Sequence, residues 1–159
     1  MSRWSTWSRL VSLTLVSPMR VSPHRLATLL ARRLNDVVPA PFRLDAKNGL
    51  LHLYIEDEWD TTSFTLDIVE DETREFAERL ESAVASILSS IQDSISEHLR
   101  TPWPSADGRA MAVPGVGSDT KSIHLWYGDD ERSAIVSIPA IQIAEIMDGE
   151  NLASVLDRP

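Results

Sequence analysis

Two histidines, His52 and His124, are the residues of this sequence whose type and spacing could do chemistry. Each lies in a short segment of alternating apolar and polar residues, two positions before an aromatic residue, Tyr54 or Trp126. If the two segments are equivalent strands, both imidazoles lie on one sheet face, where they could bind a metal ion or form an acid–base pair with Glu56. No HExxH or similar spacing accompanies them. A hydrogen-bonded structural histidine at each place is the competing interpretation.

Other motif-like stretches argue against catalysis. Residues 115–122 resemble a phosphate-binding loop, but Thr120 stands where the motif requires glycine, and a strand follows instead of a helix. We interpret the stretch as a hairpin turn. The acidic segments 56–60 and 129–131 lack a calcium-loop pattern and suit solvated hairpin ends. The chain has no cysteine and no Gly-x-Ser-x-Gly elbow, so we predict a non-catalytic protein without a cofactor.

Four aromatic residues are the predicted binding residues: Tyr54, Trp59, Trp103 and Trp126. Tyr54 and Trp126 point, like the two histidines, away from the apolar side of their strands. A face with aromatic residues at its centre and acidic residues at its rim has the composition of a protein contact surface. We therefore expect this face to bind another protein.

The element that must position these strands is one long helix over residues 72–99. Its apolar residues recur every three or four positions and form one stripe, made of Phe76, Leu80, Val84, Ile87, Leu88, Ile91, Ile95 and Leu99. His98 lies at the edge of the stripe and is expected in the core. Pro102 ends the helix. Such a helix spans roughly 42 Å, so a sheet must cover it along its length.

Alternating patterns and turn signals predict the other elements. A first helix begins at Ser22 and Pro23 and ends before Pro39. Strands are predicted at 42–44, 50–56, 63–68, 109–113, 123–127 and 134–138, with a glycine-bearing turn at 114–119 and a short helix at 139–147. In the 109–113 strand, Met111 and Val113 should face the core. The predicted fold is two-layer α+β, an antiparallel sheet of five or six strands with the long helix, about 72–99, across one face.

The two halves of the chain follow a similar order. Residues 51–68 and 123–138 each hold a histidine-bearing strand, an acidic tip and another strand, and each follows a helix that ends in Pro-x-Pro. An internal duplication of a helix-plus-three-strands unit would explain this layout. Convergence of two amphipathic hairpins is the alternative, since identities are few.

Charge is unevenly distributed along the chain, whose net charge is −9. Residues 1–35 carry six arginines and no acid, whereas residues 36–159 carry nine basic and 24 acidic side chains. Such an acidic surface repels nucleic acid and anionic lipid. No run approaches the ~18 apolar residues that stable membrane insertion requires. Together with the absence of cysteine, these features predict a cytoplasmic protein.

The predicted organisation is one domain over residues 23–148, between an N-terminal arm at 1–22 and a C-terminal tail at 149–159. The first 18 residues lack core periodicity. They admit four interpretations: a disordered arm, a stretch upstream of a true start at Met19, a secretory signal, or a basic amphipathic arm that touches a membrane.

Residues 123–129, Ile-His-Leu-Trp-Tyr-Gly-Asp, and the Pro-Trp-Pro at 102–104 carry a resemblance. They resemble a group of small uncharacterised bacterial proteins with a Pro-Trp-Pro loop and a Leu-His-Leu-Trp-Tyr-Gly-Asp strand. That resemblance covers about residues 37–144 and implies no activity. The element order also resembles type III secretion chaperone-like folds, which would imply a chaperone-like role.

We therefore predict a small acidic protein-binding module, adaptor or chaperone-like. Two alternatives stay open: a small enzyme or metal-binding protein that uses His52 and His124, and a toxin-neutralising, immunity-like protein, which the negative charge would suit. The expected partner is another protein, and homodimer formation also stays open.

Overall fold

The structure, a computed structural model, describes residues 21–56, 58–65 and 75–147 of the 159-residue chain. Its elements are α2 (Pro23–Asn35), β1 (Phe42–Lys47), β2 (Leu50–Ile55), β3 (Glu58–Thr65), α3 (Phe76–Leu99), β4 (Pro114–Ser118), β5 (Ser122–Gly128), β6 (Ala134–Gln142) and α4 (Ile143–Ile146). The predicted α+β class is confirmed. Most of the predicted arm and the whole predicted tail lie outside the described residues, as do 66–68 of the third predicted strand.

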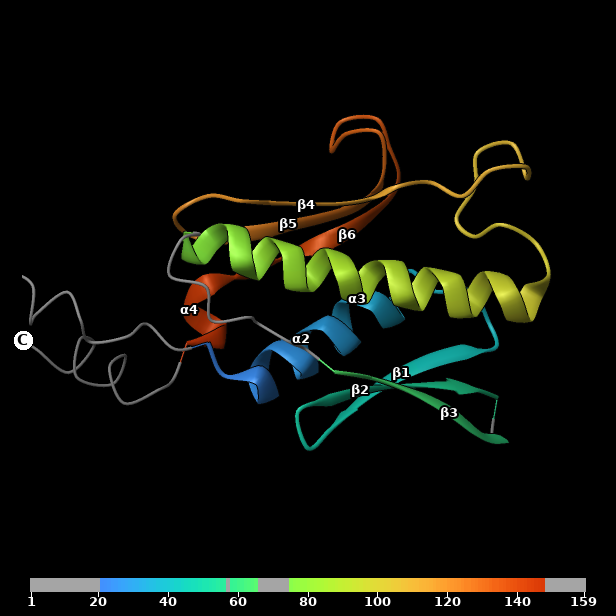
Figure 1. Cartoon of the computed structure of the whole chain (residues 1–159), viewed down its shortest axis with the longest axis horizontal. Coiled ribbons are helices and arrows are strands. Elements are labelled where there is room, and N and C mark those ends of the chain that lie inside the picture. Colours follow the sequence, from blue (N-terminus) through green and yellow to red (C-terminus); the bar gives the residue numbers. More distant parts are fainter. Residues whose placement is uncertain (1–20, 57, 66–74, 148–159) are drawn as a thin grey trace, which may run out of the picture.

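The strands form two antiparallel sheets, ordered β1-β2-β3 and β4-β5-β6. The prediction of one sheet of five or six strands under a single long helix is wrong. Both α2 and α3 contact strands of both sheets, so the two helices form a middle layer with one sheet on either side (Figure 1). Each sheet has one apolar face, and both apolar faces are buried against the same pair of helices in one core.

Helix α3 begins at Phe76, with Glu75 as its N-cap, four residues later than predicted; residues 72–74 lie outside the described part. The middle of the predicted stripe is buried as expected: Leu80, Val84, Ile87, Leu88, Ile91 and Ile95. The ends differ, since Phe76 is half-buried and Leu99 is 36% exposed. Arg100 adopts a left-handed conformation (φ 57°) directly after the helix, as a helix C-terminus often requires.

Helix α2 begins where the sequence predicts. Ser22 Oγ accepts a hydrogen bond of 3.3 Å from the backbone N–H of Arg25, and Pro23 lies in the first turn. Near the other end, the Asn35 side chain contacts both backbone groups of Leu44, donating to the carbonyl and accepting from the N–H, each at 2.7 Å. This double contact ties α2 to β1.

Strand β3 begins at Glu58, five residues before its predicted start at Ser63. Ile55 of β2 pairs with Glu58, so residues 58–60 of the predicted acidic loop belong to β3. Glu56 has a φ of 54°, the left-handed conformation that tight hairpin turns use. The residues after Glu58 therefore extend the strand instead of forming a loop.

The stretch before β5 also differs from its prediction. Residues 109–113 form no strand, and Met111 and Val113 are 43% and 64% exposed instead of core-facing. The strand at this place is β4, residues 114–118, which was predicted as a turn. Its Gly115 and Gly117 pair with Trp126 and His124 of β5. The two glycines allow the large side chain of Trp126 to lie close to β4, and they do not form a bend in the chain.

The end of the described chain closes the fold. β6 continues through Pro139 to Gln142, so the predicted helix from Pro139 is wrong and α4 is one short turn. Pro139 falls where the β5–β6 register shifts, and such an irregularity tolerates a residue without an N–H. After α4, Met147 pairs with Val21 at the beginning of the described chain.

The order of a helix followed by three strands thus occurs twice, as the likeness of the two halves predicts. β2 and β5, which hold His52 and His124, are the centre strands of their sheets. Among the helices of the described residues, none has the length and apolar character needed to cross a membrane.

Candidate functional site

The predicted site residues lie on two different surfaces. His52 and Tyr54 are on the outer face of the β1–β3 sheet, whereas His124 and Trp126 are on the outer face of the β4–β6 sheet. The helices lie between the two sheets, so these faces point away from each other (Figure 1). The expectation that the two imidazoles share one face is therefore wrong, because equivalent strands belong to separate sheets.

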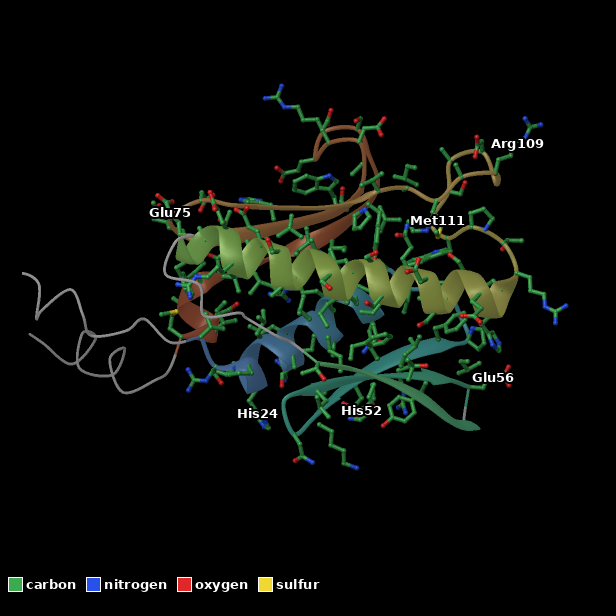
Figure 2. All side chains as sticks on the ribbon, in the orientation of Figure 1. His24, His52, Glu56, Glu75, Arg109 and Met111 are labelled. Atoms are coloured by element: carbon green, nitrogen blue, oxygen red, sulfur yellow. The ribbon has the colours of Figure 1, made fainter. Side chains whose placement is uncertain are left out.

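His52 has an ordinary polar environment. Its Nδ1 lies 3.0 Å from the Ser63 hydroxyl on β3, and its ring lies 6.4 Å from the ring of Tyr54. Arg43 lies on β1, the other neighbour of β2. Its guanidinium is 5.3 Å from the centroid of the Tyr54 ring. Figure 2 shows His52 and Glu56 at separate places along the chain, and within the described residues no contact joins them. The acid–base pair of His52 with Glu56 is thus not formed.

His124 lies between two carboxylates. Its Nε2 is 3.1 Å from Asp119 Oδ2, in the turn between β4 and β5, and its Nδ1 is 3.1 Å from Glu131 Oε1, in the connection between β5 and β6. The side chain of His124 is 33% exposed, against 58% and 59% for the two acids. The hydrogen bond to Asp119 raises the pKa of His124, and the charge of Glu131 adds to this effect.

Asp119 is held by three donors. The hydrogen bond from His124, followed by those from the backbone N–H groups of Lys121 and Ser122 (2.8 Å each), lowers the pKa of the Asp119 carboxyl to about 2. The carboxylate is therefore charged at any ordinary pH. Residues 119–121 form the turn between β4 and β5, so only this part of the stretch predicted as a hairpin turn is a turn, and residues 115–118 before it belong to β4.

The two acids do not make His124 a metal site. They contact opposite ring nitrogens and so do not converge on a common point with the imidazole. Within residues 21–56, 58–65 and 75–147, no group of three or more His, Asp or Glu side chains has an arrangement that could hold a metal ion.

Trp126 lies flat against β4. A Cβ atom placed on Gly115 would overlap the indole ring, and one placed on Gly117 would contact it at 3.6 Å. The ring is half-buried, and its Nε1–H is buried with no hydrogen-bond partner among the described residues. The two glycines are the reason that such a large ring can lie directly on its neighbour strand.

Two exposed apolar residues extend this surface, and sequence reasoning missed both. Val113 is 64% exposed just before β4, and Ile135 is 43% exposed in β6. Pro114 and Val136 pair with Tyr127, whose side chain points inward, so alternation places Val113 and Ile135 on the outer face with Trp126. The alternation of β6 could have identified Ile135. Val113 could not be found, because its strand was predicted in the wrong place.

The remaining predicted residues lie elsewhere. Trp103 packs edge-on against the buried Tyr127, with ring centroids 5.4 Å apart, and its backbone N–H donates to Ser96 Oγ. Its ring therefore belongs to the margin of the core. Trp59 lies in β3, and its side chain falls outside the part that the structure describes. His98, expected in the core, is exposed and contacts Phe42 edge-on.

Searches of the chain against protein-family models, curated proteins and solved structures gave no match.

Proposed function

We propose that this protein is a non-catalytic binding module, adaptor or chaperone-like, whose partner is a basic polypeptide segment with apolar side chains. The binding surface is the outer face of the β4–β6 sheet, centred on Trp126.

The proposal rests on the contrast between the two outer faces. The face of the β1–β3 sheet carries charged and hydroxylated side chains, among them Arg43, Asp45 and Ser63. These side chains surround Tyr54 on that face. The face of the β4–β6 sheet instead carries Trp126 on two glycines, with the exposed apolar residues Val113 and Ile135 on the same face. Apolar surface of this kind, on the outer face of one of two similar sheets, is typical of an interaction site.

The rim of this surface supports a basic partner. Four carboxylates lie at its two ends: Asp119 in the β4–β5 turn, and Asp129, Asp130 and Glu131 in the β5–β6 connection. Lys121 and Arg132 are the cations of the same two connections. The overall charge of −9 adds a long-range attraction for cationic chains. A segment with apolar anchors and flanking arginines would complement both features.

The geometry gives less support to a site built on both histidines. His52 and His124 lie on faces that point apart, and each has its own hydrogen-bond partners. A metal-binding protein or small enzyme that uses this pair would require the two imidazoles to meet. A toxin-neutralising role is compatible with the proposal, because it too requires a protein partner.

Binding to a peptide array tests the proposal. The array holds arginine-rich peptides with Leu or Trp anchors, and a matched set in which glutamate replaces arginine. We expect the wild-type protein to bind the first set and not the second. Trp126→Ala should lose this binding while keeping its circular dichroism spectrum and cooperative unfolding.

Tyr54→Ala is the matched control, because Tyr54 occupies the corresponding position of the other sheet. It should bind the arginine-rich peptides as the wild type does. Equal binding by wild type and Trp126→Ala would refute the proposed surface.

A further inference from the structure

We infer that His124 is a proton-operated latch on the proposed binding face, an inference that rests on the proposed function. The latch holds the β5–β6 tip, residues 129–133, next to Trp126 while the imidazole is doubly protonated. Loss of one ring proton releases the tip and uncovers the aromatic surface.

The hydrogen-bond partners of the His124 ring define its protonation state. A carboxylate accepts hydrogen bonds and cannot donate them, so each contact of His124 requires an N–H on that nitrogen. Both ring nitrogens face a carboxylate oxygen at 3.1 Å. The observed geometry therefore belongs to the imidazolium form. A neutral ring would turn one bare nitrogen lone pair toward a negative charge.

The charged groups that face His124 are these two acids. Asp119 comes from the β4–β5 turn and Glu131 from the tip. On the neighbouring strands, Gly117 of β4 pairs with His124, and the irregular stretch of β6 opposite it holds Pro139 and Ala140. None of these three residues titrates. The state of the ring is thus coupled to the two acids at its ends.

The two contacts are unequal, which decides which one breaks. Asp119 also accepts backbone N–H bonds from Lys121 and Ser122, so it stays in place whether or not the ring is charged. Within the described residues, Glu131 is held by its contact with His124. A neutral His124 therefore keeps its Nε2–H on Asp119 and loses the proton of Nδ1. Repulsion from that bare nitrogen then releases Glu131.

The position of Trp126 connects the latch with binding. His124, Trp126 and Gly128 follow one another at every second position of β5, and the tip begins directly after Gly128. Figure 1 shows this connection bending away from the strands and turning back above the sheet. Because its anchor is His124, the tip spans the position of Trp126. The hydrogen bond from the Ser133 N–H to Asp130 Oδ1 (2.8 Å) keeps the tip internally closed, so it moves as one piece.

The direction of the pH response follows from the same contacts. The bonds to carboxylates raise the pKa of His124 above its usual 6.5. The latch is consequently closed below that range and opens as the pH rises through the raised pKa. Binding of a partner to this face should therefore become stronger as the pH rises.

Nuclear magnetic resonance of the ¹⁵N-labelled full chain tests the latch without any partner. The nitrogen shifts of His124 should show two ring protons at pH 6 and one, on Nε2, at pH 9. The hydrogen-exchange rate of the Trp126 indole N–H is then compared between wild type and Glu131→Gln at pH 9. An amide at position 131 can donate to a neutral Nδ1, so the tip of this variant should stay closed. We expect wild-type exchange to be about tenfold faster, because the tip of the wild type is released at this pH and that of the variant is not.

Asp129→Asn is the matched control, since it removes the same charge from the tip without touching His124. It should exchange like the wild type. One ring proton at pH 6, or equal exchange in wild type and Glu131→Gln at pH 9, would overturn the latch.

Binding of the arginine-rich peptides separates failure of the latch from failure of the proposed function. Arginine keeps its charge throughout this pH range. Wild-type binding should be stronger at pH 9 than at pH 6, and Glu131→Gln should bind weakly at both. Binding that depends on Trp126 but responds equally to pH in both proteins would retain the surface and reject the latch. Loss of all dependence on Trp126, with intact protonation and exchange results, would reject the surface alone.

Discussion

The phenol of Tyr127 donates a hydrogen bond of 2.8 Å to the backbone carbonyl of Leu88. Leu88 lies near the middle of α3, and Tyr127 lies in β5, the centre strand of its sheet. Burial raises the pKa of the Tyr127 phenol, and the charge of Asp93 adds to the effect. The Trp103 ring packs edge-on against the same residue. One buried side chain thus joins the second sheet, the long helix and the Pro-Trp-Pro loop.

Removal of this hydroxyl should destabilise the protein moderately. We expect Tyr127→Phe to lower the free energy of unfolding by about 1–2 kcal/mol, because a buried hydrogen bond is lost while the ring packing remains. Urea denaturation measures the change. Tyr54→Phe, on the outer face of the other sheet, should change it by less than about 0.5 kcal/mol. Equal losses at the two positions would show that the bond to Leu88 contributes nothing.

The core face of α3 can be tested at two neighbouring residues. Ile91 is fully buried and Ser90 is partly exposed. Ile91→Ala should cost about 2–5 kcal/mol, because it removes buried apolar surface and leaves a cavity. Ser90→Ala should be neutral or slightly stabilising, since alanine has the higher helix propensity. A similar cost for both variants in thermal or chemical denaturation would contradict the described orientation of the helix.

The two glycines under Trp126 should respond differently to the same substitution. In Gly115→Ala the new methyl group overlaps the indole, so the ring must move, and we expect a loss of about 1–3 kcal/mol. In Gly117→Ala the methyl group meets the ring at 3.6 Å, an ordinary contact, and stability should change little. The Trp126 indole resonance should shift strongly in the first variant only. An unchanged resonance in Gly115→Ala would place the ring elsewhere.

The stability that His124 contributes should depend on pH in one direction. Its pKa is raised in the folded protein, so its contribution is complete below pH 6.5 and disappears as the pH rises through the folded value. Asp119, with a pKa lowered to about 2, stays charged throughout. The difference in unfolding free energy between wild type and His124→Gln should therefore be larger at pH 5.5 than at pH 9. The opposite trend would mean that the ring is neutral in the folded protein.

The periodicity of apolar and polar residues was sufficient to predict the features that depend on a single helix or strand. The spacing of apolar residues identified the long helix and its buried face, and Ser22 with Pro23 marked the start of α2. Alternation correctly placed Tyr54 and Trp126 on outward faces. These features follow from the geometry of a single helix or strand, in which the direction of each side chain repeats with a fixed period.

Only the tertiary structure decided which segments meet. Both a single large sheet and two smaller sheets satisfy the same alternating patterns, and burial of two apolar faces against α2 and α3 selects the second. The role of Gly115 became clear only once Trp126 was found lying on it. The partners of His124 come from two turns, five and seven residues away, whose paths no local pattern describes. Contacts between segments depend on how apolar faces cover one another in space, and the sequence by itself determined the faces but not their pairing.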